Sequence, residues 1–292
     1  MRNDFLINTD SACFVRDETA IKTANYTSRH RSSSTKSGDR FASNMSDAEK
    51  IAQTKNLLDR AIAYAWHTVK SDHRPPTLTS TRWVWRLAGA YHFSRHTSRL
   101  MEEAAQRFAA SGRQSLAQWA KQKAREEAGH DRLALLDIQS MGYEAEAVVQ
   151  ALVPSAATVA VDYFIQSVEA INPINCVGHS YASERLGTFQ GEEYIQSVEA
   201  LLPPGTHATR WLRIHTGVGA EVKHIEDTVE IVAEMTLEDR ICVARACYET
   251  ALLRFTPPKE GYISDEELQN VLKPLELNTC LQVGTNFQKL KK

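Results

Sequence analysis

Apolar residues recur at helical spacing along most of the chain from residue 46 onward. In the first such stretch, Ser46 is followed three residues later by Glu49, which is the spacing of a capping box. An apolar stripe comes next, made of Ile51, Leu58, Ile62, Ala65 and Val69. It ends before the sequence RPP at 74–76, because proline lacks the amide hydrogen that a helix needs. The pattern predicts a helix over about 46–69.

The same spacing predicts further helices, separated by proline and glycine. They are expected at about 80–111, 113–142, 144–152, 156–171, 174–202, 206–235 and 237–255. After TPPKEG at 256–261, the sequence SDEELQNVLKPL predicts a short helix, with Ser264 and Glu267 as a second capping box. No stretch shows the alternation of a strand, so the predicted fold class is all-α.

Composition divides the chain into three parts. The segment 1–45 contains TSRHRSSSTKSGDRFASN, which has too few apolar residues to offset the entropy lost on ordering, so we expect a disordered leader. The helical pattern occupies 46–256, which is the expected domain. The remaining segment, 257–292, is expected to be a C-terminal tail that carries only the short helix.

The overall charge narrows the classes of partner. Hydrophobic residues make up 42% and charged residues 24% of the 292 residues, and the net charge is −2. No concentrated basic segment is present, which argues against nucleic acid as a partner. No apolar run approaches the roughly 20 residues that cross a bilayer, and the first residues lack the core of a signal peptide, so a cytoplasmic location is expected. Five scattered cysteines without a CxxC pair indicate reduced thiols.

The segment KQKAREEAGHDRLALLDIQSMGY at 121–143 contains the first candidate for chemistry. Glu127 and His130 stand three residues apart on what the pattern predicts to be one helix, so both side chains reach one point beside it. In helical-bundle carboxylate proteins, such ExxH pairs and single glutamates bind two iron or manganese ions. A single ExxH pair is also common on solvated helix faces, so the hypothesis depends on what accompanies it.

Two other segments supply further candidate ligands. HSYASERLGTF at 179–189 places Glu184 among apolar neighbours, on a helix face that is expected to be buried. IHTGVGAEVKHIEDTVEIV at 214–232 supplies His215 and a second ExxH pair, Glu221 and His224. Imidazoles and carboxylates from separate helices together predict a metal centre inside the bundle.

Three acidic residues are candidates for additional ligands or for supporting positions. Glu103 shares a helical stripe with His92 and His96, although histidines on a helix more often pack or hydrogen-bond than bind metal. Asp137 follows His130 by seven residues and is placed to orient its imidazole. Asp227 lies three residues after His224.

The segments AREEAGHDRLALLDIQSMGY, GHSYASERLGTFQGEEYIQSVEALLPPG and LRIHTGVGAEVKHIED resemble those of the heme-oxygenase-like di-iron oxidases and oxygenases. The resemblance covers about 80–255. It implies a heme-oxygenase-like bundle of about seven helices that binds Fe(II), two per chain, and uses O2 as co-substrate. The implied reaction is desaturation, C–C cleavage or N-oxygenation of a small amino-acid-like or fatty-acid-like metabolite. An external electron donor and a homodimer are further expectations.

The resemblance also implies roles for individual residues. Glu127 and His130 match the first Glu and His ligands, Glu184 matches the middle glutamate, and His215 matches the histidine that opens the last ligand-bearing helix. The family's next Asp and His positions are Gly219 and Val222 in this chain. Glu221 and His224 offer a carboxylate and an imidazole two residues later.

That departure leaves two arrangements open. At about 100° per residue, His215 and His224 face opposite sides of a regular helix, so both bind one centre only if the helix breaks. Gly217 and Gly219 are suited to such a break. In an unbroken helix only one of the two groups binds, and the Glu221–His224 pair with Glu103 would resemble a ferritin-like di-iron protein.

Two readings without a metal also remain at this point. Thiaminase-like hydrolases share the bundle and use a cysteine with a carboxylate, for which Cys176 is the candidate in this chain. Alternatively, the protein is a non-catalytic helical protein in which the ExxH pairs are surface features.

Overall fold

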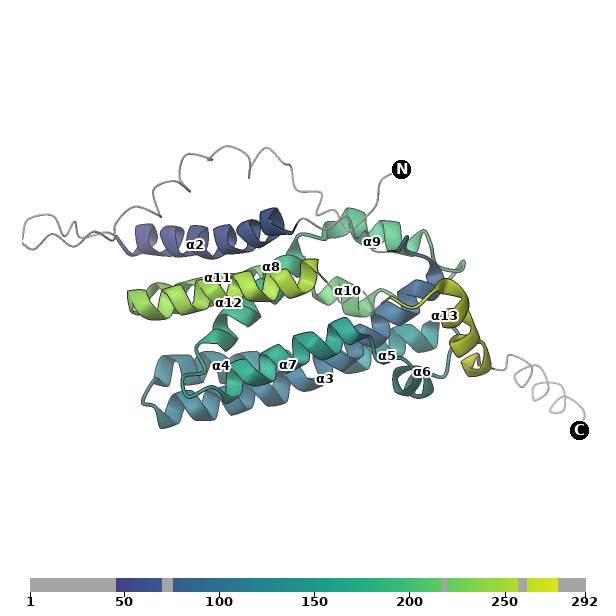
Figure 1. Ribbon diagram of the computed structural model, residues 1–292, viewed down its shortest axis with the longest axis horizontal. Coiled ribbons are helices and arrows are strands. Elements are labelled where there is room, and N and C mark those ends of the chain that lie inside the picture. Colours follow the sequence, from purple (N-terminus) through teal and green to yellow (C-terminus); the bar gives the residue numbers. More distant parts are fainter. Residues whose placement is uncertain (1–45, 70–75, 217–219, 257–261, 278–292) are drawn as a thin grey trace, which may run out of the picture.

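The structure is a computed structural model that describes residues 46–69, 76–216, 220–256 and 262–277 (Figure 1). Within these residues the regular structure is helical, apart from one isolated bridge between Tyr143 and Glu276. The all-α prediction is therefore confirmed. The leader predicted at 1–45 lies outside the described residues.

The helices follow one another along the whole described chain. They are α2 (Asp47–Thr68), α3 (Ser80–Ala110), α4 (Gln114–Glu126), α5 (His130–Ser140), α6 (Ala145–Ala151), α7 (Ser155–Glu169), α8 (Asn175–Thr188), α9 (Gly191–Glu199), α10 (Arg210–Ile214), α11 (Ala220–Ala233), α12 (Leu237–Phe255) and α13 (Asp265–Leu272), with a short 3₁₀ helix, η2 (Lys273–Leu275). Three of the long helices expected from the apolar spacing are each divided in two, so the described helices outnumber both the helices expected from that spacing and the roughly seven that the resemblance implies.

Capping residues begin several of these helices where the sequence predicts. The Ser46 and Glu49 capping box begins α2, and the Ser264 and Glu267 box begins α13, so both predictions are confirmed. Thr79 caps α3 by accepting a hydrogen bond from the Arg82 amide. These caps satisfy backbone amides that have no partner within the helix.

The expectation of a single helix across 113–142 is wrong, because the chain turns at Gly129. Gly129 has φ +87°, a left-handed backbone conformation that glycine adopts without steric cost. The helix α4 ends at Glu126 and α5 begins at His130. The expected helix at 206–235 is divided as well, since α10 ends at Ile214 and α11 begins at Ala220.

The helices form a bundle that is elongated in one direction (Figure 1). The helices α2, α11 and α12 lie along one long side, and α3, α4 and α7 lie along the other. The helix α8 packs against α12, α11 and α7 between these two sides. The shorter helices α5, α6, α10 and α13 lie toward one end of the bundle.

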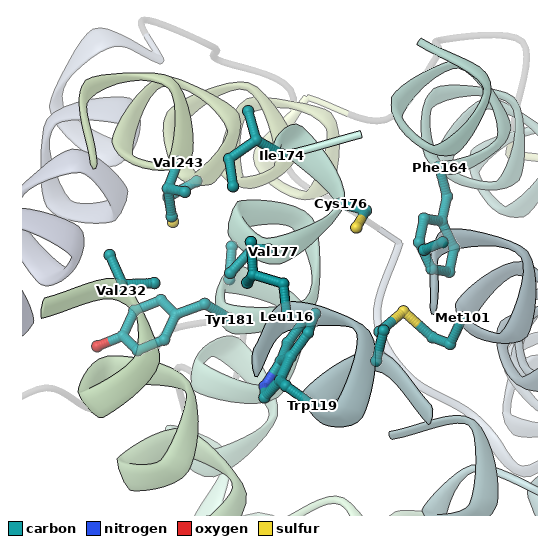
Figure 2. Close-up of a cluster of buried hydrophobic side chains, with 14 of the residues drawn as sticks. Met101, Leu116, Trp119, Phe164, Ile174, Cys176, Val177, Tyr181, Val232 and Val243 are labelled. Atoms are coloured by element: carbon teal, nitrogen blue, oxygen red, sulfur yellow. The ribbon is translucent and has the colours of Figure 1, made fainter. Parts of the chain in front are cut away.

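The larger hydrophobic core lies between the two long sides of the bundle (Figure 2). Each long helix contributes fully or nearly fully buried side chains to it, among them Leu58, Met101, Trp119, Phe164, Tyr181, Val232 and Val243. Burying apolar surface of this kind contributes about 25 cal/mol per Å², which makes this core the main stabilising element of the bundle.

A second buried cluster holds the end of the bundle together. The first half of α3 packs there against α5, α6, α10 and α13, and Leu268 and Leu272 of α13 are almost fully buried. Arg82 of α3 forms an ion pair with Asp265, and the Leu277 amide donates to the Gly142 carbonyl at 2.8 Å. The short helix of the predicted tail is therefore packed onto the domain.

The length and apolar content of the helices in the described residues bear on whether they could cross a membrane. None of them is by itself long and apolar enough to cross a bilayer. The helices α6 and α7 meet the requirement only when they are taken together, and the chain bends by 80° between them.

Candidate metal centre

Three side chains that bear metal-binding groups meet where three helices end or begin. Glu127 is the residue after the last turn of α4, His130 is the first residue of α5, and His215 follows the last turn of α10. One nitrogen or oxygen from each of them lies within 4.8 Å of the others. Two ligands of one metal, each about 2.1 Å from it, lie at most about 4.2 Å apart. Small side-chain rotations therefore bring these three groups to one cation.

The rings around this cluster fix its shape. The His130 Nδ1 atom lies 3.2 Å from Glu127 Oε2, and the rings of His130 and His215 meet edge to face with centroids 4.9 Å apart. The Trp211 ring packs on His215, with centroids 4.7 Å apart. Trp211 is itself held by a hydrogen bond from Nε1 to the Ser94 hydroxyl. The two imidazoles and the carboxylate are thus oriented before any ligand binds.

The turn at Gly129 makes the meeting of Glu127 and His130 possible. The His130 amide donates to the Glu127 carbonyl at 3.4 Å, so the two residues span a tight turn instead of one face of a helix. The residues predicted from the ExxH spacing are therefore neighbours in space, although the local structure differs from the predicted one. A spacing of three residues brings side chains together in a turn as well as in a helix.

The electrostatic environment keeps the Glu127 carboxyl ionised. Burial alone would raise the pKa of Glu127, because the charged form loses hydration. The hydrogen bond with His130 and the charges of His215, His130 and Lys123 outweigh burial and lower the pKa below its ordinary value. The Glu127 carboxylate is therefore the anionic group of the cluster.

Asp137 connects the helices that carry the two histidines. Its carboxylate is fully buried on α5 and accepts hydrogen bonds from the Trp211 amide at 2.9 Å and from Arg210 Nη1 at 3.0 Å. Burial raises the pKa of Asp137 above its ordinary value despite these bonds. Asp137 thus holds the start of α10 against α5. The hydrogen bonds from Arg210 and Trp211 make Asp137 a residue that positions α10.

A glycine lets α8 approach the cluster closely. A Cβ atom added to Gly187 would lie 2.5 Å from the His215 carbonyl oxygen. Only glycine therefore permits this approach. Glu184 lies three residues before Gly187 on α8. The close contact at Gly187 therefore brings the helix that carries Glu184 next to the His215 backbone.

Glu184 is buried next to this contact, and its partner is a lysine. Lys123 Nζ lies 2.8 Å from Glu184 Oε1, and the two side chains are only 3% and 7% exposed. The same ammonium lies 3.7 Å from Glu126 Oε2, and His224 Nε2 lies 3.3 Å from that oxygen. Glu184, Lys123, Glu126 and His224 therefore form a second polar cluster, which we call the lysine cluster.

Sequence reasoning missed Lys123 and Glu126. A signal for Lys123 was present, because it follows Leu116 and Trp119 at spacings of seven and four residues, on the apolar stripe of α4. A lysine on such a stripe indicates a buried partner. The sequence pattern alone does not say which helix supplies that partner.

Comparisons with known proteins support the fold. No family model matches the sequence, and no curated protein matches it. A solved structure of a domain of unknown function from Shewanella denitrificans, described as having a heme oxygenase-like fold, is similar with a TM-score of 0.54. Its sequence is 18% identical, and the match covers 80% of this chain and 94% of that chain. The fold is heme oxygenase-like. An identity this low shows the fold alone.

The other candidate ligands occupy different parts of this heme oxygenase-like bundle. Glu103 pairs with Arg107 at 3.1 Å and with Arg99 at 3.7 Å, both on its own helix. Asp227 is exposed on α11. The side chain of Glu221 lies outside the described residues. Within the described part of the chain, only Glu127, His130 and His215 form a group of three or more that gathers its ligand atoms this closely.

A groove of about 560 Å³ runs between α4 and α11 of the heme oxygenase-like bundle. Trp119, Lys123, Glu126, Asp227 and Ile231 are among the residues that line it. Its volume falls in the range of about 300–1,000 Å³ that is usual for sites of small molecules. Lys123 and Glu126 of the lysine cluster form part of its wall.

Proposed function

We propose that the protein is a non-heme iron enzyme, an O2-dependent oxidase or oxygenase that acts on a small metabolite. The observation that carries this proposal is the composition of the cluster, which has two histidines and one glutamate. Two imidazoles and one carboxylate are the ligand set with which non-heme Fe(II) oxygenases hold iron and keep positions open for O2 and substrate.

The chemistry of the three donors fits Fe(II). Glu127 supplies a charged oxygen, because its pKa is lowered, and His130 and His215 supply ring nitrogens. All three residues are partly buried, so a cation bound there would be largely withdrawn from water. Bound Fe(II) would bring O2 binding and activation to this position. The Asp137 contacts with α10 would keep His215 in place beside His130.

The reaction class that we propose is desaturation, C–C cleavage or N-oxygenation of an amino-acid-like or fatty-acid-like substrate. Desaturation or N-oxygenation in a single step withdraws two electrons from the substrate, whereas full reduction of O2 takes four. An external electron donor supplies the other two. The groove between α4 and α11 supports a substrate of small-metabolite size.

The geometry favours this proposal over the metal-free hydrolase. Cys176 is completely buried in the larger core, and burial raises the pKa of its thiol far above the ordinary value. The thiolate needed for nucleophilic attack is therefore strongly disfavoured. A ferritin-like centre gains no support from Glu103, whose carboxylate pairs with arginines of its own helix.

Anaerobic reconstitution tests the proposal. Purified full-length protein is loaded with Fe(II) under argon and freed of excess iron, and bound iron is measured. O2 consumption is then followed with ascorbate as donor and a panel of amino acids and fatty acids. The wild type is expected to retain iron and to consume O2 with a member of the panel.

The His215→Ala variant is expected to lose both properties. The matched control is His207→Ala, which removes an exposed histidine just before α10 and should leave both unchanged. Absence of bound iron in the wild type, or equal O2 consumption by the His215→Ala variant, would contradict the proposed function.

A further inference from the structure

The lysine cluster places the positively charged side chain of Lys123 beside the candidate metal centre. The Lys123 ammonium is nearly excluded from solvent and lies 2.8 Å from Glu184 and 3.7 Å from Glu126. Lysine presents three N–H donors and no lone pair when it is protonated, so it serves as a cation and not as a ligand.

The position of Lys123 conflicts with a metal ion at Glu184. A metal would bind about 2.0–2.2 Å from a carboxylate oxygen. The ammonium already lies 2.8 Å from Glu184 Oε1, so the two cations would be near neighbours in a site with little water. Like charges at such a separation repel strongly when solvent does not screen them. A metal ion on Glu184 would therefore sit beside the unscreened charge of Lys123, and this repulsion disfavours a metal ion there.

The charges of the two clusters also match a single metal ion. The described residues bring three carboxylates to them, those of Glu126, Glu127 and Glu184. One ammonium and one divalent metal ion neutralise three carboxylates. A second divalent ion would leave excess positive charge in the bundle interior, where uncompensated charge is costly.

We infer that Lys123 takes the place of a second metal ion, so that the protein binds one divalent metal per chain. Glu127, His130 and His215 hold the metal, and Glu184 is the counterion of Lys123. The inference rests on the proposed function, because it takes the cluster of three ligands to be a metal site. It differs from the two irons per chain that the sequence led us to expect.

Metal titration of the full chain tests the inference. Co(II) alone is added under argon to metal-free protein, and bound cobalt is measured by equilibrium dialysis and elemental analysis. The wild type is expected to bind one Co(II) per chain. Its electron paramagnetic resonance signal should integrate to one isolated high-spin Co(II) per chain, because a coupled pair of ions would lose that signal.

A double variant separates a ligand from a counterion. Lys123→Met combined with Glu184→Gln removes both charges and nearly keeps the two side-chain volumes, so no buried charge is left alone. The matched single variant is Glu127→Gln. The double variant is expected to bind one Co(II) with an affinity within about threefold of the wild type, whereas Glu127→Gln is expected to lose at least about tenfold.

The outcomes distinguish the inference from the proposed function. Two Co(II) per wild-type chain would overturn the inference and leave the proposed iron enzyme standing. No bound Co(II) would overturn both. Loss of metal by a double variant with a wild-type circular dichroism spectrum would show that Glu184 is a ligand, and this also overturns the inference. If the double variant does not fold, the cobalt signal of the wild type decides between one ion and two.

Discussion

Two glutamates buried in the same bundle have different partners. Glu127 faces the imidazoles of His130 and His215, whereas Glu184 faces the ammonium of Lys123. Imidazoles bring lone pairs, so a carboxylate among them forms a site that is completed by a cation from outside. An ammonium is already a cation, so the carboxylate beside it is neutralised by the chain. The difference teaches that the partner of a buried carboxylate, more than its burial, indicates whether it binds metal.

Removing a histidine of the candidate metal centre should have the largest effect on metal affinity. His130→Ala takes away one of three ligands, and we expect the affinity for Fe(II) or Co(II) to fall by at least about 100-fold, since even the loss of a partner behind a ligand costs 10–100-fold. His224→Ala is the matched comparison, because His224 pairs with Glu126 in the lysine cluster. It should keep the affinity within about threefold. Equal losses in the two variants, measured by equilibrium dialysis, would erase the distinction between the clusters.

Breaking the ion pair between Lys123 and Glu184 in the lysine cluster should affect stability more than metal binding. Lys123→Met leaves Glu184 buried without its cation, which is expected to lower the free energy of unfolding by about 3–5 kcal/mol. The double variant with Glu184→Gln should recover most of that loss. Urea denaturation of the metal-free proteins measures both values. A single variant as stable as the wild type would show that the pair contributes little.

Loosening the contact between α5 and α10 should indirectly weaken metal binding at the candidate metal centre. Asp137→Ala removes the acceptor of the Trp211 amide and of Arg210, so His215 is held less firmly. We expect an affinity for Co(II) about tenfold lower, within the range found for partners that orient ligands. Asp131→Ala, on the first turn of the same helix, is the control. Unchanged affinity in the Asp137→Ala variant would mean that α10 is positioned by its other contacts.

A third carboxylate, Asp59, extends the comparison to a more exposed ion pair. Arg185 binds it through Nε at 2.9 Å and Nη2 at 3.2 Å, and the side chains of Asp59 and Arg185 are 17% and 22% exposed. Asp59→Asn is expected to cost about 1–2 kcal/mol, less than the loss of Lys123. An equal or larger cost would show that burial does not separate the two pairs.

The pH dependence of that cost follows from the pKa of Asp59. Burial acts to raise this pKa, but Arg185, Tyr181 and Lys55 outweigh burial and lower it below its ordinary value. An acid whose folded pKa is lowered contributes stability at neutral pH. This contribution is lost as the pH falls from about 4, near the unfolded value, through the folded pKa. The stability difference between the wild type and Asp59→Asn should therefore shrink below pH 4 in denaturation experiments.

The fold could largely be predicted from the sequence, because its signals are local. Apolar spacing and capping boxes place α2, α3, α12 and α13 within a few residues of their observed limits. The points where the expected long helices are divided in two were harder to predict. Gly129 lies within an otherwise continuous helical pattern, and a glycine there is compatible with either a helix or a turn.

The candidate site could be predicted only in part. The spacing of Glu127 and His130 indicates proximity whether the chain is helical or turned. The glycines after His215 left a break in the helix open, and the structure divides it there into α10 and α11. The apolar neighbours of Glu184 indicate its burial, which the structure shows. Its pairing with Lys123 depends on how α4 and α8 pack, and no local pattern contains that information.

The position of the metal ion tests the central claim most directly. Crystals of the full chain grown with Co(II) are measured at the cobalt absorption edge, and an anomalous difference map locates the ion. We predict one peak per chain, about 2.0–2.2 Å from ligand atoms of Glu127, His130 and His215. Absence of a peak at these three residues, or a peak bound by Glu184 and His224 instead, would contradict the account.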